Sequence, residues 1–380
     1  MHEHKHNQCR RKVKHRKNVM KLIIFCITVG ISLMFIYYQN LRKEIDARQK
    51  WLETVLAGEK KWILENQGPK GEFYMNGSKA GDVNPYFACM AALGLLAETK
   101  NCLITETEKK AVNRYLDWHT GILLETDGKM GIYRKESGKL IYKEKADSED
   151  GYLGMYLFLM GKYLEKTEST DLPEYWKNGI SLALKKIQSL MQDGITQVSG
   201  ENTTVYLMDN LEVWKGLYEL EHAGIKDMPA VSEMRKKLQA KIEKLFWDDA
   251  NQRWRIIENS DLYHQKEFYP DGVAQIYPLI YEFPVKEKKK QKILYEQFTE
   301  RFQWQKLNKK RNGFLWAMTG MAAAQMGDIN NLVELIENYE TEYCENRKYP
   351  LYTGEAGWIC MECEKLYSLY ERKIKTGFLG

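Results

Sequence analysis

The sequence carries little excess positive charge outside its first 21 residues. Of its 57 Lys and Arg side chains, eight lie in positions 1–21, where Glu3 is the single acidic residue. The other 359 residues carry 49 basic and 51 acidic side chains, a net charge of −2. Binding to nucleic acid usually needs a basic surface. We therefore expect no nucleic-acid partner for the body of the chain.

Paired cysteines and metal-binding motifs are also scarce. Cys9 and Cys26 lie in the N-terminal tail and the apolar run after it, which leaves five cysteines in the body. An odd number excludes a complete disulfide framework. Cys360 and Cys363 form a CxxC pair inside an apolar helical pattern, with no second pair and no nearby His. We interpret them as core residues rather than zinc or redox ligands, and expect no metal and no cofactor.

Residues 22–38 (LIIFCITVGISLMFIYY) form a run of 17 residues without a charge. As a helix it would span about 26 Å, at the short end for crossing a membrane. Tyr37 and Tyr38 suit the membrane–water interface. A cleaved signal peptide is the alternative, but no small-x-small cleavage site follows the run. We expect an uncleaved, single-pass signal anchor in the cell membrane.

The basic flank should stay in the cytoplasm, which places the chain after about residue 40 outside the membrane. The predicted parts are a cytoplasmic tail (1–21), the anchor (22–38), a linker (39–44), one large domain (45–372) and a C-terminal tail (373–380). The four His residues of the first tail could form a metal tract. We favour a segment that contacts anionic lipid.

From residue 43 onward the apolar spacing is helical, and turn residues interrupt it regularly. The pattern predicts twelve helices, at 43–66, 85–99, 105–120, 150–166, 172–191, 206–223, 229–247, 270–283, 286–304, 312–326, 328–345 and 354–371.

These helices alternate in composition. The first, third and later odd members are charged on one face, as in 234–246 (MRKKLQAKIEKLF), whereas the even members are almost uncharged, as in 85–96 (PYFACMAALGLL). A helix that is apolar nearly all round must be buried. Six buried and six half-exposed helices predict an all-α fold, an (α/α)6 toroid of six helical hairpins. An open superhelical array of hairpins shares the alternation and is the other possibility.

Long connections precede the buried helices, and short ones follow them. Residues 125–149 are an example of a long connection, and alternating residues within 131–142 predict a small β-hairpin insertion there. The starts of the buried helices should therefore share the loop-rich face of the fold, where function usually lies.

Carboxylates accompany aromatic residues at five of the six buried-helix starts, near positions 82–87, 147–152, 206–212, 269–271 and 355–358. Glycoside hydrolysis needs two carboxyl groups, and aromatic rings stack on sugars. Asp147 and Asp150 share a helix face, as do Asp209 and Glu212, and a like-charge pair raises one pKa, as a general acid requires. Simple N-capping is the alternative for each single Asp.

These stretches resemble the six-hairpin glycosidases, over roughly residues 45–372. The likeness to glycoside hydrolase family 8 is distant: in its Ala, Ser or Thr, Asp, small, Asp signature, Ala146 and Asp150 match and residues 147–149 depart. The segments that carry the resemblance are WILENQ (62–67), the NPYFA start at Asn84, DSEDGY (147–152), MDNLEVWKGL (208–217) and FYPDGVAQ (268–275).

The resemblance implies roles for twelve residues. Either Asp82 or Asp150 would be the general acid, with the other, Asp147 or Asp271 as base. We expect Asp82, Asp150 and Asp271 to converge on one open cleft. Sugar hydroxyls and sugar faces would be bound by Asp209, Glu212, Glu355, Tyr86, Tyr152, Tyr269, Trp316 and Trp358.

The sequence thus predicts a membrane-anchored, extracytoplasmic glycoside hydrolase whose partners are a carbohydrate substrate and the membrane. A saccharide-binding or assembly protein of an envelope polysaccharide system, without catalysis, is the alternative. A lanthionine cyclase is disfavoured because no Cys-His pair follows Cys363, and a terpene cyclase because Ser148 interrupts the carboxylates. A polysaccharide lyase is disfavoured because the body's His residues do not lie at the starts of buried helices.

Overall fold

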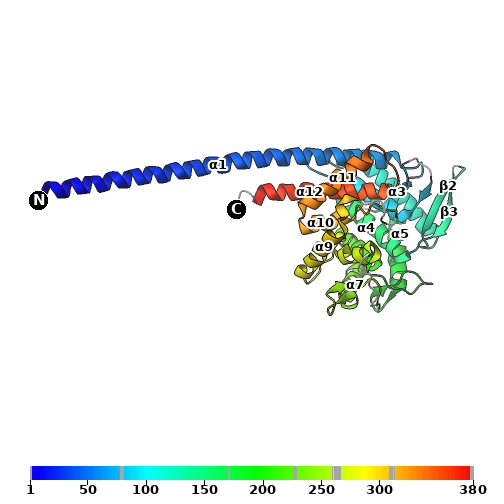
Figure 1. Ribbon diagram of the computed structural model, residues 1–380. Coiled ribbons are helices and arrows are strands. Elements are labelled where there is room, and N and C mark those ends of the chain that lie inside the picture. The colour runs from blue at the N-terminus through cyan, green and yellow to red at the C-terminus, as the bar shows by residue number, and fades with distance from the viewer. Residues whose placement is uncertain are drawn as a thin grey trace. The chain divides into compact units, whose positions relative to one another are not determined.

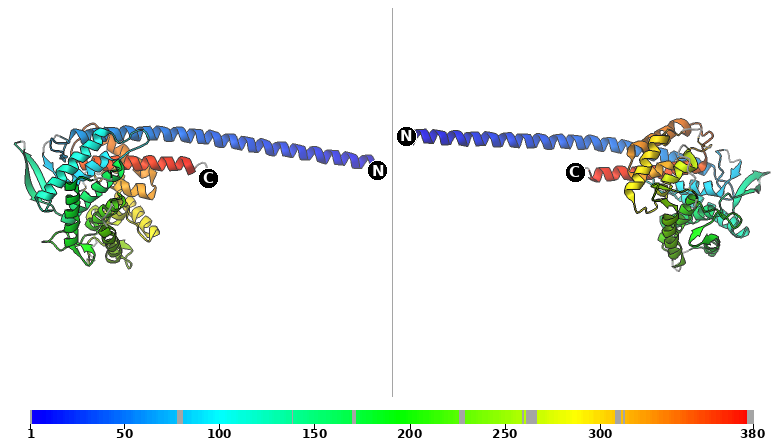
Figure 2. Two further views of the ribbon diagram at one scale, coloured as in Figure 1. Left: turned by 180° about the vertical axis from the view of Figure 1, so that it is seen from behind. Right: turned by 60° about the horizontal axis from the view of Figure 1, so that its bottom comes forward.

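The computed structural model describes residues 2–77, 81–137, 139–169, 172–225, 229–258, 260, 267–307, 311 and 313–376. The chain divides into two units. One is the body, residues 52–369, and the other combines residues 1–51 with 370–380. Figures 1 and 2 show the body as a cluster of helices with a small sheet.

Twelve α-helices alternate between an outer and an inner set in the described part of the chain. The outer helices are α1 (His2–Glu65), α3 (Glu106–Glu125), α5 (Glu174–Leu190), α7 (Pro229–Phe246), α9 (Lys288–Phe302) and α11 (Ile329–Tyr339). The inner helices are α2 (Pro85–Leu95), α4 (Glu149–Thr167), α6 (Leu207–His222), α8 (Val273–Ile280), α10 (Thr319–Met326) and α12 (Thr353–Thr376).

Burial separates the two sets as the sequence predicts. All eight residues of α8 are buried, whereas only four of the fifteen residues of α9 are. Each inner helix from α2 to α8 packs on the next inner helix, and each from α2 to α10 packs on the outer helix that follows it. The all-α toroid of helical hairpins is therefore confirmed.

Close backbone contacts join the inner helices into a closed ring. A Cβ added at Gly154 of α4 would lie 2.7 Å from the backbone nitrogen of Val213 in α6. One added at Gly94 of α2 would lie 2.5 Å from Cα of Gly357 in α12. Because α2 and α12 are the first and last inner helices, this contact excludes the open superhelical array.

Short strands lie in the connections that precede the inner helices. β1 (Asp82–Val83), β2 (Gly131–Glu136) and β3 (Lys139–Lys145) form an antiparallel sheet, with Asp82 opposite Arg134 and Gly131 opposite Lys145. The hairpin expected over 131–142 is therefore present, and it projects from one end of the body (Figure 1). Two further hairpins are β4 (Met191–Gln192) with β5 (Ile195–Thr196), and β6 (Trp247–Asp248) with β7 (Arg253–Trp254).

The structure differs from the sequence prediction at three helix starts. Residues 39–44, the predicted linker, lie within the continuous helix α1. Helix α8 begins at Val273, after a π-helical turn (Phe268–Gly272) in which Tyr269 is extended. Helix α10 begins at Thr319, because residues 313–318 form a loop held by a carboxylate of α12. Residue 312, the predicted start of α10, lies outside the described residues.

The N-terminal part of α1 includes the apolar run. Its described segment from Ile23 onward is long and apolar enough to cross a membrane, with a mean hydropathy of 1.6 over its most apolar window. By length and composition, a signal sequence passes the same test.

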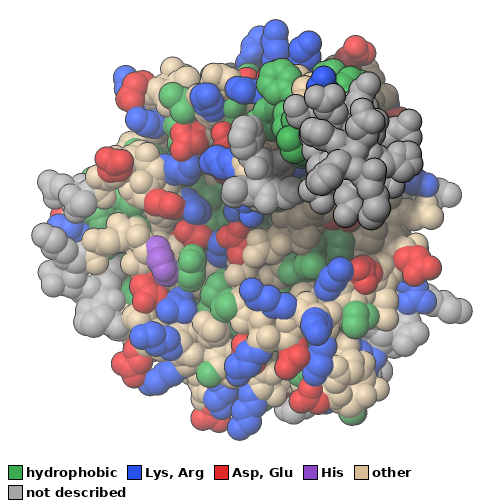
Figure 3. Space-filling view, turned by 90° about the vertical axis from the view of Figure 1, so that its left-hand side faces the viewer, with side chains coloured by type: hydrophobic (Ala, Val, Ile, Leu, Met, Phe, Trp, Pro, Cys, Tyr) green, Lys and Arg blue, Asp and Glu red, His purple; other side chains and the backbone are tan. Residues whose placement is uncertain are grey.

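Charged side chains of both signs are mixed over the face shown in Figure 3. Many charged side chains of the body form short ion pairs, such as Lys162 with Glu165 at 2.7 Å and Lys166 with Glu98 at 2.8 Å. This surface agrees with the near balance of charges in residues 22–380.

The ring contact predicts opposite effects for two glycine substitutions. Gly94→Ala forces α2 away from α12, so we expect the free energy of unfolding to fall by about 1–3 kcal/mol. Gly121→Ala, on outer helix α3, is the control, because nothing lies within 4 Å of its added Cβ. Alanine favours the helix there by about 0.5–1 kcal/mol. Denaturant titration of the full chain measures both, and a Gly94→Ala variant as stable as the parent would contradict the contact.

Candidate functional site

A cavity of about 260 Å³ lies where the six inner helices begin. Every inner helix, or the residues just before it, contributes at least one side chain. The lining residues are Asn84, Tyr86, Phe87, Met90, Asp147, Ser148, Tyr152, Met208, Asp209, Glu212, Tyr269, Tyr277, Phe314, Trp316, Met318, Glu355 and Trp358. The cavity is thus a product of the ring itself.

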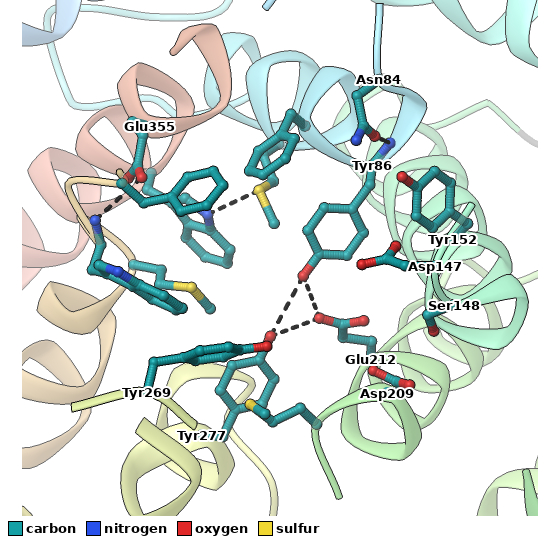
Figure 4. A pocket seen from close by; sticks show the side chains of 17 residues that line it. Asn84, Tyr86, Asp147, Ser148, Tyr152, Asp209, Glu212, Tyr269, Tyr277 and Glu355 are labelled. Atoms are coloured by element: carbon teal, nitrogen blue, oxygen red, sulfur yellow. Dashed lines mark hydrogen bonds between the residues drawn. The ribbon is translucent and has the colours of Figure 1, made fainter. Parts of the chain in front are cut away.

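Helix caps place the side chains on one part of this lining. The Asn84 side chain accepts a hydrogen bond from the backbone N–H of Tyr86 at 2.9 Å and so starts α2. The Ser148 hydroxyl accepts from the N–H of Gly151 at 3.1 Å and starts α4. Asn84 and Ser148 are therefore helix caps that also face the cavity (Figure 4).

Three carboxylates, Asp147, Asp209 and Glu212, form what we call the carboxylate wall. Figure 4 shows them together on one side of the cavity, opposite Tyr269. Burial raises the pKa of Asp209 well above its usual value, and the charges of Asp150 and Glu212 raise it further. Asp147, by contrast, is exposed.

Glu212 is the most deeply placed member of this wall, with 3% of its surface exposed. Its Oε1 accepts hydrogen bonds from the hydroxyls of Tyr86, Tyr277 (2.7 Å) and Tyr281 (3.3 Å). Its Oε2 fits against Gly151, where an added Cβ would lie only 2.6 Å from it. Burial raises the pKa of Glu212 to about 7, while the hydroxyls of Tyr277 and Tyr86 act in the opposite direction.

Four rings, those of Phe87, Phe314, Trp316 and Tyr269, form a continuous aromatic wall. Phe87 stacks on Phe314 with 5.5 Å between ring centroids, and Trp316 lies 4.8 Å from Tyr269. Phe314 and Trp316 join the two pairs at 6.0 Å. The cavity therefore offers apolar ring faces on one side and carboxylates on the other.

Glu355 fixes the loop that carries two of these rings. One of its oxygens accepts from the backbone N–H groups of Leu315 (3.1 Å) and Trp316 (3.2 Å), and the other from that of Ala317 (2.9 Å). Burial raises the pKa of Glu355 to about 7 against these hydrogen bonds. Trp316 has φ of +59°, a left-handed backbone that is rare for a bulky residue. Glu355 is thus engaged as a loop anchor, and its predicted contact with sugar hydroxyls stays a prediction.

All eight residues predicted to bind substrate line the cavity. Of the four carboxylates predicted to be catalytic, Asp147 lines it, whereas Asp82, Asp150 and Asp271 do not. The expected convergence of those three on one open cleft is therefore not found.

The structure gives physical reasons for these exclusions. Asp82 lies in β1 and pairs with Arg134 (2.7 Å) and Lys143 (2.8 Å), which hold its pKa below the usual value. Asp150 is fully buried behind the carboxylate wall, where it accepts from Thr196 (2.7 Å) and Ser148 (2.8 Å). Asp271 is 2% exposed, inside the π-helical turn. The geometry supports none of the three as acid or base.

Tyr277 and Tyr281 are functional candidates that the sequence reasoning missed. Tyr277 lies on α8, and Tyr281, four residues later, is the C-cap of that helix, so the two side chains lie on the same face. Their spacing in IYPLIY was visible, but the pattern could not show that this face meets Glu212 of α6. Phe87 and Phe314 were also missed, because the sequence pattern could not show that their rings stack on each other beside the cavity.

Metal ligands do not cluster in the described part of the chain. No group of three His, Cys, Asp or Glu residues there is arranged to hold an ion. Cys360 and Cys363 are buried in α12, and burial raises their pKa values well above the usual range. His264 lies outside the described residues.

No family model matches the sequence, and no curated protein matches it either. Several solved structures are similar in fold. A glycosidase variant has a TM-score of 0.60 at 12% identity, covering 88% of this chain and 98% of its own. A D-mannose isomerase has a TM-score of 0.56 at 12% identity, covering 84% and 97%.

A third neighbour is an inactive variant of the α-1,6-mannanase GH76A of Salegentibacter sp. HEL1_6, in complex with α-1,6-mannotetrose. Its TM-score is 0.56 at 9% identity, covering 84% of this chain and 99% of that one. Identities this low show the fold alone. The body has the (α/α)6 toroid fold of the six-hairpin glycosidases, a fold that hosts more than one reaction.

The buried carboxyl groups predict how stability depends on pH. A carboxyl whose pKa is raised by folding favours the folded state below its unfolded pKa, and this contribution is lost as pH rises through the folded pKa. For Glu212 and Glu355 that window runs from 4.5 to about 7. We expect the free energy of unfolding to fall across it by up to ~3 kcal/mol per group, and Glu212→Gln to flatten the fall.

Glu282 is the matched control for this measurement. Burial acts to raise its pKa, but the charges of Lys215 and Lys365 win and lower it to about 2. Its contribution is therefore present above pH 4.5 and is lost as pH falls toward 2. Glu282→Gln should lower the free energy of unfolding at every pH above about 4.5, and it should change the slope of the curve only on the acid limb, leaving the slope between pH 4.5 and 7 as in the parent chain. A pH profile of unfolding that is flat between 4.5 and 7 in the parent chain would contradict the assignment.

Proposed function

We propose that this protein is a membrane-anchored glycoside hydrolase, in which Glu212 is the general acid and Asp147 the second catalytic carboxylate. One observation carries the proposal: a wall of carboxylates and a wall of aromatic rings lie on opposite sides of the cavity. Sugar rings stack their apolar faces on aromatic side chains, and cleavage of a glycosidic bond uses two carboxyl groups. The glycoside hydrolase fold of the neighbours is consistent with this use of the cavity.

Glu212 has the properties that a general acid needs. Burial brings its pKa to about 7, so a large fraction of the carboxyl groups is protonated near neutral pH. The three tyrosine hydroxyls hold its Oε1 in one place. Its other oxygen, Oε2, lies close to Ser148 and Gly151, at the start of α4.

Asp147 reaches the same cavity from the start of α4 and is the exposed member of the wall. In the proposed step, the Glu212 proton passes to the glycosidic oxygen, and the C1–O bond breaks with its electron pair on that oxygen. A water oxygen bonds to C1, and its proton passes to Asp147. If Asp147 itself bonds to C1 first, water then displaces it and the anomeric configuration is retained.

Asp209 completes the wall without a catalytic step of its own. Burial and the charges of Asp150 and Glu212 raise its pKa, and in its protonated form the carboxyl group can donate to a sugar oxygen. Glu355 contributes indirectly, because it holds the loop that carries Phe314 and Trp316.

A pair of substitutions tests the catalytic assignment. Glu212→Gln keeps the size of the side chain and removes the proton donor, so we expect kcat to fall by about 10²–10⁴-fold. Asp147→Asn should lower it similarly, and Asp82→Asn, whose side chain lies outside the cavity, should leave it near the parent value. Activity is measured on a panel of oligosaccharides, with the anomeric product followed by NMR.

Two outcomes would contradict the assignment of Glu212 and Asp147 as catalytic residues. The first is a Glu212→Gln variant that hydrolyses substrate as fast as the parent chain. The second is saccharide binding without turnover by the parent chain, which would favour a binding or assembly protein. If the parent chain interconverts free sugars instead, its reaction would be an isomerisation, as the name of the D-mannose isomerase neighbour describes.

The N-terminal segment supports a second part of the proposal, a single-pass anchor at residues 22–38 with the tail 1–21 in the cytoplasm and the domain 45–372 outside the membrane. Described residues 23–37 include many exposed apolar side chains, among them Ile24, Phe25 and Phe35 at 58%, 65% and 62% exposure. A helix that exposes such residues needs an apolar surrounding.

Cell fractionation tests the anchor. The full chain should stay with membranes in high salt, and protease added outside intact cells should digest the domain. A variant without residues 2–40 is the control and should be found in the soluble fraction. A mature N-terminus mapped just after residue 38 would overturn the anchor in favour of a cleaved signal sequence.

A further inference from the structure

The cavity carries an unusual balance of charge. Its lining includes four carboxyl groups, Asp147, Asp209, Glu212 and Glu355, but no Lys, Arg or His among the described residues. None of the four forms an ion pair with a described residue. Elsewhere in the body, several buried carboxylates pair with cations, as Glu59 with Arg347, Glu108 with Lys60, Glu219 with Lys215, and Asp248 with Arg255, whereas Asp150 and Glu362 are buried without a described ion pair.

Arg311 is the described basic residue just before the loop that carries Phe314 and Trp316, and its guanidinium contacts groups outside the cavity lining. Arg311 places its guanidinium 4.3 Å from the centre of the Phe268 ring and donates to the backbone carbonyl of Phe302. It does not line the cavity. Both signs of charge are mixed on the face in Figure 3, and residues 22–380 carry 49 basic and 51 acidic side chains. The chain as a whole therefore lacks the excess of carboxyl groups that the described lining of the cavity has.

Uncompensated burial has a measurable consequence. Burial and the neighbouring charges of Asp150 and Glu212 raise the pKa of Asp209, and burial raises that of Glu212. Each of these groups would ionise more readily beside a positive charge. A cationic ligand is thus stabilised by the cavity, whereas an anionic ligand is repelled by it.

The aromatic wall favours the same sign of charge. The faces of Trp316, Tyr269, Phe314 and Phe87 carry the negative part of the ring quadrupole, which attracts a cation within about 6 Å. The same faces stack on the apolar side of a sugar ring. One ligand satisfies both walls, namely a sugar ring that carries a protonated amino group.

We propose that the cavity binds a glycosyl unit with a free amino group, of the hexosamine class, and rejects uronic acids and sulfated sugars. The inference rests on the proposed function, since this unit is the one whose glycosidic bond is cleaved. The cavity of about 260 Å³ limits the bound part to a small ligand, the size of one or two rings. N-acetylation removes the charge and adds bulk, so the acetylated sugar binds less well.

Binding of four matched sugars to the full chain in detergent tests the inference without any need for turnover. Glucosamine, N-acetylglucosamine, glucose and glucuronate are titrated by calorimetry at low and high salt. A charge-assisted contact is expected to favour glucosamine over N-acetylglucosamine and glucose by about tenfold or more. Glucuronate should bind most weakly, and added salt should narrow the differences. Equal binding of glucosamine and N-acetylglucosamine, or tighter binding of glucuronate, overturns the inference.

Two variants locate the effect in the cavity. Asp209→Asn removes a carboxyl group from the carboxylate wall and should reduce the ratio of glucosamine affinity to glucose affinity severalfold. Asp82→Asn, a carboxylate outside the cavity, is the control and should leave the preference unchanged. An unchanged preference in Asp209→Asn, or an equal loss of preference in both variants, would place the recognition elsewhere and overturn the inference.

Hydrolysis separates this inference from the proposed function. The parent chain is assayed on a fully de-N-acetylated amino-sugar oligosaccharide, its N-acetylated counterpart and a neutral oligosaccharide with the same linkage. A preference in kcat/KM for the first substrate supports both proposals. Equal hydrolysis of all three keeps the hydrolase and overturns the amino-sugar inference. Selective binding of glucosamine without hydrolysis of any substrate keeps the inference and overturns the hydrolase.

Discussion

Backbone contact between neighbouring inner helices decides where the functional side chains can be. Gly154 lets α4 approach the backbone of α6, and Gly94 meets Gly357 where the ring closes between α2 and α12. Side chains are excluded from those contacts, so the helices lie close together and their first turns point at one shared space. The cavity is the space that remains at that end, and every inner helix contributes to it. Its residues are therefore distant in sequence but adjacent in the fold.

Burial without a compensating cation gives this space its chemistry. A carboxylate withdrawn from water has a raised pKa unless an opposite charge is near. Glu282 shows the compensated case, in which two lysines lower the pKa despite burial. Glu212 shows the uncompensated case, in which three tyrosine hydroxyls offset the effect of burial only in part. Glu212 is also the more deeply buried of the two, but the opposite directions of their pKa shifts come from their neighbours.

The sequence predicted the architecture well, because amphipathic and fully apolar helices alternate in a regular order. It also predicted that carboxylates and aromatic residues would meet at the starts of the buried helices, where the cavity lies. It failed where tertiary contacts override local pattern. The start of α10 was placed too early because Glu355, 40 residues after Leu315, holds the preceding loop open through its backbone amides.

The choice among carboxylates failed for a related reason. Asp82, Asp147 and Asp150 look alike in the sequence, since each precedes or begins a buried helix. Only tertiary neighbours distinguish them: Asp82 meets two cations across the β-sheet, and Asp150 meets Thr196 of β5 behind the wall. Spacing along one helix could likewise reveal that Tyr277 and Tyr281 share a face, but not which carboxylate that face contacts. The sequence thus shows the types and spacing of these residues, whereas the partners that they contact depend on how the helices pack in the closed ring.

A fold that hosts hydrolases and an isomerase does not select a reaction, so the selection must lie in how the ring divides its cavity. The carboxylate wall comes from the starts of α4 and α6, which are neighbours in the ring. Most of the aromatic wall comes from the segments before α8 and α10. Because these are separate arcs of one scaffold, the carboxylate wall and the aromatic wall can change independently. Under the proposed function, the first arc would determine which bonds can be broken, and the second would determine which ring is held against it.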